Sequence, residues 1–94
     1  MKTKVIFRKE ESGVIAIFPH IIGSRVQKTV LCYSHNEQHS SCDYMDTIRF
    51  SKPASQTEAN ELLKELVFTA GYENLQIIKK ASLSKVYGQF YNLI

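Results

Sequence analysis

The sequence predicts a two-layer α+β domain, in which two helices pack on a mainly antiparallel sheet of four to five strands in the order β-β-β-β-α-β-α. Three observations predict this class. Short β-branched and aromatic runs recur through the first half of the chain, an amphipathic stripe follows at residues 55–71, and a second stripe ends the chain. The 94 residues have material for one hydrophobic core, so we expect residues 1–94 to form a single domain.

The composition is that of an ordinary globular protein, with 44% hydrophobic and 22% charged residues, which argues against disorder. The net charge is only +3, and bases and acids are spread evenly, unlike the basic surface of a strong nucleic-acid binder. No segment has the length of a signal-peptide core or a membrane span, so we expect a cytoplasmic protein without membrane contact. Its two cysteines are too few for a disulfide framework and would stay thiols there.

The first two predicted strands form a hairpin. Residues 5–9 and 14–18 are β-branched and aromatic, and the polar residues 10–13 between them predict a turn. Pro19 lacks an amide proton, so we expect it to end the second strand. Residues 20–27 then form a predicted connecting loop.

A third strand is predicted over residues 28–34, which are apolar on both faces, as is typical of a central strand. The chain then becomes polar over residues 35–46, without a helical or a strand period, so we expect a loop or a loop with one helical turn. Residues 47–51 alternate again, and Pro53 closes this fourth strand, which we place at an edge of the sheet.

A helix is predicted to begin at Ser55, because Ser55 and Glu58 have the spacing of a capping box. Apolar residues recur at helical spacing on one face, and Gly71 supplies a left-handed C-terminal cap. The stripe comprises Ala59, Leu62, Leu63, Leu66, Val67 and Ala70.

After this helix, residues 75–80 predict a short strand, which would complete a strand–helix–strand unit with a right-handed crossover if its two strands are parallel neighbours. Residues 83–94 repeat a helical apolar stripe, weakened by Gly88. An extended strand is the alternative there, because residues 86–91 are β-prone. The predicted core comprises Val5, Phe7, Ile15, Ile17, Val30, Cys32, Ile48, Phe50, Leu62, Leu63, Leu66, Val67, Ile77, Val86 and Phe90.

Several short segments carry a resemblance over most of the chain. They are residues 5–9, 13–19, 33–35, 38–40, 52–55 and 71–72. Together they resemble a family of small uncharacterised proteins from bacteriophages and bacterial mobile elements, in which a glycine usually stands at the position of Glu37. The resemblance implies a phage or mobile-element context without a biochemical activity, and a loop around His35 and His39 with Tyr33 two residues before the first histidine.

The polar segment 33–46 is the predicted interaction site, because loops on a rigid scaffold carry recognition. We expect a non-enzymatic interaction protein, and the residues expected to contact its protein partner are Tyr33, His35, Gln38, His39 and Asp43. The sheet is a second expected interface, since its strands are apolar on both faces. A homodimer or a partner would cover the open face, unless loop 20–27 or the C-terminal helix does so.

A small zinc-binding module is the alternative function, with zinc as its cofactor. Cys32, His35, His39 and Cys42 have the ligand types of a tetrahedral zinc site. Strand geometry weakens this set, because side chains at odd separation point to opposite faces unless the strand ends at Tyr33.

Catalysis and nucleic-acid binding have less support. Cys42, His39 and a nearby aspartate match a Cys–His nucleophile in type, but the sequence has no nucleophile elbow or glycine-rich phosphate loop. We therefore expect no enzymatic activity and no nucleotide cofactor. Weak nucleic-acid binding is a second alternative, based on three lysines near two tyrosines that also fall in the apolar stripe. These residues are Lys79, Lys80, Lys85, Tyr87 and Tyr91.

Overall fold

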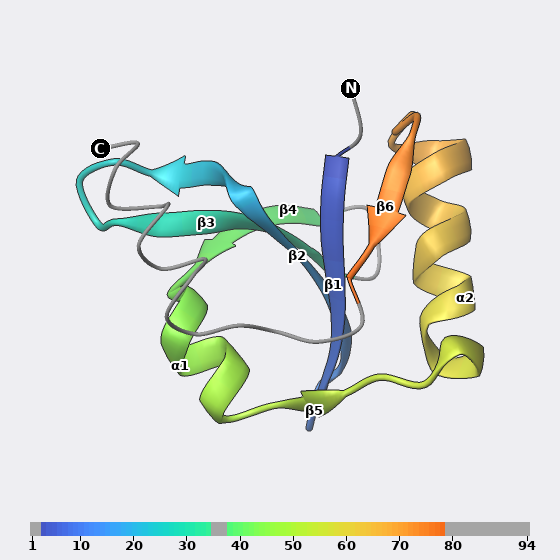
Figure 1. The fold of residues 1–94 in the computed structure, drawn as a ribbon, viewed down its shortest axis with the longest axis horizontal. Helices are drawn as coiled ribbons and strands as arrows, with labels where there is room; N and C mark the ends of the chain where they lie inside the picture. Colours follow the sequence, from blue (N-terminus) through green and yellow to red (C-terminus); the bar gives the residue numbers. More distant parts are fainter. Residues whose placement is uncertain (1–2, 35–37, 79–94) are drawn as a thin grey trace.

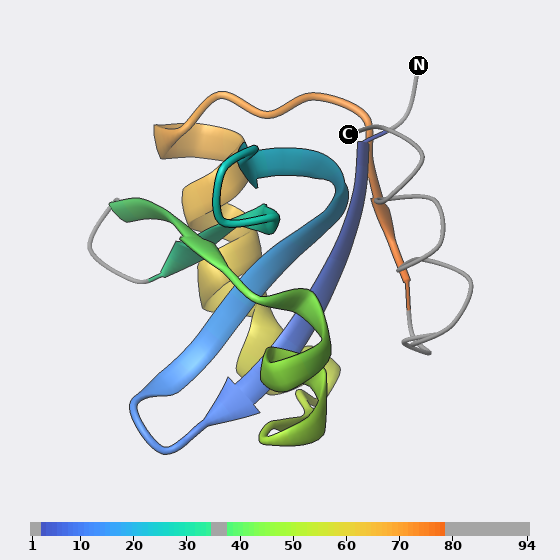
Figure 2. The ribbon, with the colours of Figure 1, turned by 90° about the vertical axis from the view of Figure 1, so that its left-hand side faces the viewer.

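The chain forms a six-stranded, mainly antiparallel sheet with a helix on each face (Figures 1 and 2). The computed structural model describes residues 3–34 and 38–78. The elements in chain order are β1 (Thr3–Glu10), β2 (Gly13–Ser24), β3 (Thr29–Ser34), β4 (Gln38–Cys42), α1 (Tyr44–Arg49), β5 (Lys52–Pro53), α2 (Gln56–Lys64), the π-helical turn η1 (Glu65–Thr69) and β6 (Leu75–Ile77). The predicted α+β class, with a mainly antiparallel sheet and two helices, is confirmed.

The strand order is β4-β3-β2-β1-β5, and β6 also pairs with β1. β1 and β2 form the predicted hairpin, with Phe7 opposite Ala16. On the other side of β1, β5 runs antiparallel beside Arg8 and Lys9, whereas β6 runs parallel beside residues 3–5. The predicted strand after the helix is therefore confirmed, but its parallel neighbour is β1 and not a strand at residues 47–51.

The polar segment contains the largest departure from the sequence prediction. Residues 38–42 form strand β4, so the loop predicted there is wrong, and residues 35–37 lie outside the described residues. The helical turn that the prediction allowed is present at the start of helix α1, residues 44–49, whereas the predicted strand at 47–51 is wrong. Asp43 caps α1, since its side chain accepts a hydrogen bond from the Asp46 amide at 3.0 Å. The strand was predicted from the alternation of Ile48 and Phe50, but Phe50 is exposed, and Ile48 is instead buried one helical turn after Tyr44.

Strand β2 continues beyond Pro19, where the sequence predicted its end. The pairing with β3 shifts between Phe18 and Ile22, and an irregular segment of this kind accepts a proline because no ladder bond is lost. After the shift, the strand approaches its neighbours closely at Gly23. A Cβ atom there would lie 2.6 Å from Ser41 Cβ, so only glycine fits.

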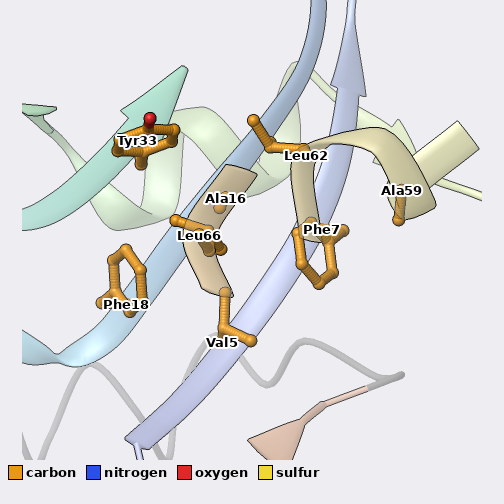
Figure 3. Packing of buried hydrophobic residues seen from close by; sticks show 8 residues of the cluster. All are labelled: Val5, Phe7, Ala16, Phe18, Tyr33, Ala59, Leu62 and Leu66. Atoms are coloured by element: carbon orange, nitrogen blue, oxygen red, sulfur yellow. The ribbon is translucent and has the colours of Figure 1, made fainter. Parts of the chain in front are cut away.

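Two apolar clusters form the core, one on each face of the sheet. The α2-side cluster (Figure 3) comprises Val5, Phe7, Ala16, Phe18, Tyr33, Ala59, Leu62 and Leu66. The α1-side cluster comprises Ile6, Ile17, Val30, Tyr44 and Ile48. Each face of the sheet therefore carries a helix, and α1 packs on the face for which we had expected a dimer, a partner, loop 20–27 or the C-terminal helix as cover. The predicted C-terminal helix lies outside the described residues.

Most of the predicted core is buried. The confirmed residues are Val5, Phe7, Ile17, Val30, Cys32, Ile48, Leu62 and Leu66. Ile15 and Leu63 are half-buried. The predictions for Phe50, Val67 and Ile77 are wrong, since these side chains are 82%, 40% and 46% exposed. Val86 and Phe90, like the predicted helix at 83–94 and its strand alternative, lie outside the described residues.

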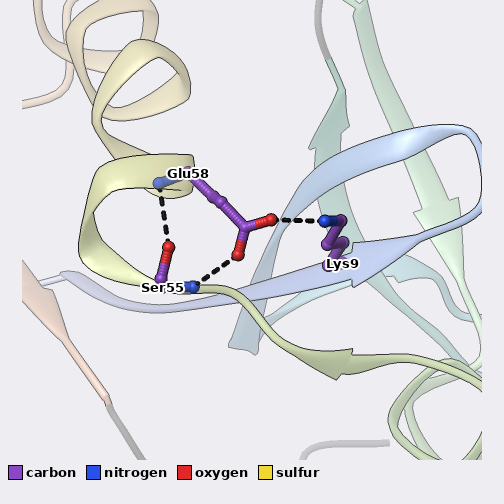
Figure 4. A network of polar contacts seen from close by, with 3 residues as sticks. All are labelled: Lys9, Ser55 and Glu58. Atoms are coloured by element: carbon purple, nitrogen blue, oxygen red, sulfur yellow. Dashed lines mark hydrogen bonds and ion pairs between the residues drawn. The ribbon is translucent and has the colours of Figure 1, made fainter.

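Helix α2 begins with the predicted capping box. Glu58 donates its amide to Ser55 Oγ at 3.1 Å, and Ser55 donates its amide to Glu58 Oε1 at 3.0 Å (Figure 4). At its other end the chain widens into η1, where Ala70 donates its amide to the Glu65 carbonyl five residues back. This extra residue per turn rotates the positions after Leu66 out of the apolar stripe.

Gly71 has φ +80°, so the predicted left-handed cap at the end of this helical segment is confirmed.

Within the described ranges, no helix combines the length and the apolar character that a membrane crossing requires.

The Glu58 carboxylate makes stability depend on pH in the acid range. Its ion pair with Lys9 and its hydrogen bond from the Ser55 amide lower the pKa of Glu58 from 4.5 to about 2 (Figure 4). A lowered folded-state pKa stabilises the fold above the unfolded value, and this stabilisation is lost as the pH falls from about 4.5 to about 2. We expect Glu58→Gln to flatten this part of a plot of Tm against pH. An unchanged acid limb would contradict the assignment.

Candidate functional site

Strand β4 is an edge of the sheet. In residues 3–34 and 38–78, only β3 pairs with it. Its residues His39, Ser40 and Ser41 are exposed, and the sequence from Gln38 to Cys42 contains no charge and no proline. Natural proteins usually protect an edge with charges, prolines or short strands. The edge at β5 has such protection, because β5 is only Lys52 and Pro53.

Backbone hydrogen bonds fix the direction of each β4 peptide group. The Phe7 carbonyl accepts a hydrogen bond from the Ala54 amide, which lies on the side of β1 away from β2. The peptide groups of odd-numbered β1 residues therefore point away from β2, and those of even-numbered residues point toward it. Following this alternation through the pairings of β2 with β1 and β3, and of β3 with β4, shows that the Cys32 peptide groups point toward β4 and exchange hydrogen bonds with Ser40. His39 and Ser41 therefore turn both their N–H and their C=O groups outward, away from the sheet.

Side-chain alternation divides the segment between the two faces. Tyr33 and His39 are paired and lie on the side of α2, because Tyr33 belongs to the α2-side cluster. Cys32 and Cys42 lie on the opposite side, where Cys42 packs against the α1-side cluster.

His39 is a predicted contact residue that reaches the surface, and it stands in a small aromatic group. Its ring meets Tyr33 edge-on at 4.7 Å, and its Nε2 atom lies 2.9 Å from the Tyr72 hydroxyl. Tyr72 stacks on Phe18 at 4.9 Å between ring centroids, and partial burial raises the pKa of Tyr72. The segment after η1 is thereby attached to the edge strand.

The other predicted contact residues have different surroundings. Tyr33 is 1% exposed and donates its hydroxyl to Glu65 Oε1 at 3.3 Å, so it belongs to the core rather than to a contact surface. Asp43 is occupied as the cap of α1. Gln38 begins β4, and His35 lies outside the described residues.

Three of the four predicted zinc ligands do not converge, and the fourth, His35, lies outside the described residues. His39 lies on one face of the sheet, and Cys32 and Cys42 lie on the other, so these three side chains cannot share one tetrahedral ion. Across the described part of the chain, no group of three or more histidine, cysteine or acidic side chains is placed to hold a metal ion.

The two thiols form a pair of their own. Cys32 Sγ lies 3.1 Å from Ser40 Oγ, and the two cysteine side chains share a hydrogen bond. The hydrogen bond from Cys42 lowers the pKa of Cys32 to about 7, while the same contact and burial raise the pKa of Cys42. The first proton therefore leaves the pair more easily than it leaves an ordinary thiol.

Two residues of the site, Tyr72 and Ser41, were not among the predicted contact residues, although Ser41 lies within the predicted segment 33–46. Tyr72 follows the capping glycine Gly71, and a residue there often folds back onto its helix, which is the signal that could have indicated it. The outward direction of Ser41 has no signal in the local sequence.

Comparisons with protein-family models, with curated proteins and with solved structures find no match to this chain.

Proposed function

We propose that this chain is a non-enzymatic protein-binding module that takes up an extended segment of a partner protein along β4. The observation that carries the proposal is the outward direction of the His39 and Ser41 peptide groups on an edge without protecting charge or proline. Two donors and two acceptors are thus arranged at strand spacing, which is what an added strand requires.

The side chains beside the edge supply specificity. An added strand alternates its own side chains between the two faces. On one face it meets the exposed His39 ring, which is held by Tyr72. The nearby turn η1, whose Glu65 accepts a hydrogen bond from Tyr33, also carries Phe68, which is 83% exposed. An apolar or aromatic side chain of the partner therefore suits this face.

The resemblance carried by the short segments implies a phage or mobile-element context. We include this context in the proposal: the partner would be a protein of the phage, the mobile element or their host cell. Zinc binding has no comparable support, because the sheet separates its candidate ligands. The lysines and tyrosines considered for nucleic-acid binding lie outside the described residues.

Ser41→Pro tests the proposal because it removes one outward amide and leaves the bonds between β3 and β4 in place. The probe is a displayed library of linear random peptides, selected for binding to the wild-type protein. We expect the selected peptides to bind Ser41→Pro at least about tenfold more weakly than the wild type, because the variant loses one hydrogen bond and its proline ring blocks the edge. The affinity is measured by calorimetry.

Ser41→Ala is the matched control, because it loses the hydroxyl and keeps the amide, and it should bind as the wild type does. Equal binding of the peptides to Ser41→Pro, with its fold confirmed by circular dichroism, would refute docking along β4. A second copy of this chain has the same edge. Light scattering over a range of protein concentrations tests for this second copy. If it occupies the edge, the wild-type protein forms a dimer and Ser41→Pro remains a monomer.

A further inference from the structure

Cys32 and Cys42 are brought together although ten positions separate them along the chain. They lie on adjacent antiparallel strands, with Cys32 opposite Ser40 and Cys42 opposite Val30, so they are diagonal neighbours on one face. Cys32 is 1% exposed, whereas Cys42 is half-buried beside α1. Cys42 is thus the more exposed residue of the pair.

We propose that Cys32 and Cys42 are a redox-active dithiol, which hydrogen peroxide oxidises to an intramolecular disulfide that joins β3 to β4. Nothing in this inference requires the partner proposed for the β4 edge. It rests on the strand pairing, the contact between the two side chains and their unequal exposure.

The reaction proceeds in two balanced steps. With Cys32 ionised, the proton of Cys42 passes to Cys32, and the Cys42 sulfur attacks one peroxide oxygen, so that the O–O bond breaks and hydroxide leaves. Cys32 then attacks the sulfur of the Cys42 sulfenic acid, the S–O bond breaks, and the departing hydroxide takes the Cys32 proton as water. The two sulfurs lose two electrons in total, and these electrons reduce one peroxide molecule. The hydroxide released in the first step takes a proton from solvent, so the peroxide ends as two waters.

The position of Cys42 on the edge strand makes the bond reachable. Diagonal neighbours on antiparallel strands are about 7–8 Å apart at Cα, slightly beyond the separation of about 7 Å that a disulfide spans without backbone movement. Cys42 therefore has to move inward by about 1 Å. In the described part of the chain β4 pairs only with β3, so no second strand holds Cys42 back.

The electrostatics of the pair favour reaction near neutral pH. The hydrogen bond from Cys42 lowers the pKa of Cys32 to about 7, so the pair carries a negative charge at a pH where an ordinary thiol is mostly protonated. The rate of oxidation should therefore rise through pH 7 rather than through pH 8.5, the usual thiol value.

The test treats the full chain with hydrogen peroxide and follows it by intact mass and by peptide mapping without reduction. We expect a loss of two hydrogen masses, a linked peptide that contains Cys32 and Cys42, and full reversal by dithiothreitol. In the oxidised protein, the Ser40 and Cys42 amides, which are bonded to β3, should exchange with solvent at least tenfold more slowly, because the strand is fixed to β3.

Cys32→Ser is the control that separates a pair from a single reactive thiol. It should give a Cys42 sulfenic acid that dimedone traps, without an intramolecular link. If the wild-type protein gives only this adduct, or only links between two chains, the proposal is wrong. Mapping the wild-type protein is decisive even if the variant fails to fold, and peptide binding along β4 is not among the readouts.

Discussion

Replacing Arg8 with methionine is expected to lower the free energy of unfolding by about 3 kcal/mol, because buried carbonyl groups then lose their donors. Arg8 is 8% exposed on β1, and its guanidinium donates to the Ile48 carbonyl at 2.9 Å and to the Ser51 carbonyl at 2.7 Å. Its Nε atom also donates to Ser51 Oγ at 2.9 Å. One side chain thus binds a carbonyl in the last turn of α1 and the Ser51 carbonyl just beyond the helix, where a positive charge also suits the helix dipole.

Arg8→Lys is the matched control for this substitution. It keeps the charge at the end of α1 but lacks the planar fork that reaches two carbonyls at once, so its effect should lie between those of the wild type and methionine. Urea denaturation at neutral pH measures all three proteins. A methionine variant within about 0.5 kcal/mol of the wild type would show that Arg8 does not hold α1 against the sheet.

Replacing Leu66 with alanine should have a similar effect, about 3 kcal/mol, since removal of a buried leucine side chain leaves a cavity. Leu66 is fully buried at the start of η1 and points between Val5, Phe18 and Tyr33 in Figure 3. The next residue, Val67, is 40% exposed because the π-helical turn rotates it out of the stripe.

Val67→Ala is therefore the control, and we expect it to cost less than 1 kcal/mol. Both variants are compared by chemical denaturation. If Val67→Ala destabilises the protein as much as Leu66→Ala does, the regular helical stripe read from the sequence continues past Leu66, and the π-helical turn is wrong.

Local sequence signals account for the parts of the fold that were predicted. The hairpin of β1 and β2 follows from two β-prone runs around a polar turn, and the capping box at Ser55 depends on two residues three positions apart. Strand β4 has no such signal, because both of its faces are polar and alternation needs one apolar face. Helix α1 is too short for its two buried positions, Tyr44 and Ile48, to be told from strand alternation.

The candidate site depends on long-range pairing, which explains why little of it could be predicted. His39 was identified as a contact residue, and it is exposed on the edge strand. The outward direction of Ser41 follows only from hydrogen bonds and registers across four strands. The same registers place His39 on the opposite face from Cys32 and Cys42, so these three predicted zinc ligands do not come together.

Residue-by-residue amide hydrogen exchange, measured by NMR on the protein alone and with a bound library-selected peptide, tests the central claim most directly. In the free protein, we predict fast exchange at His39 and Ser41 and slow exchange at Ser40 and Cys42, which are bonded to β3. With the peptide bound, His39 and Ser41 should become protected while Ser40 and Cys42 change little. Equal protection along β4 in the free protein, or peptide-induced protection confined to other strands, would contradict docking at this edge.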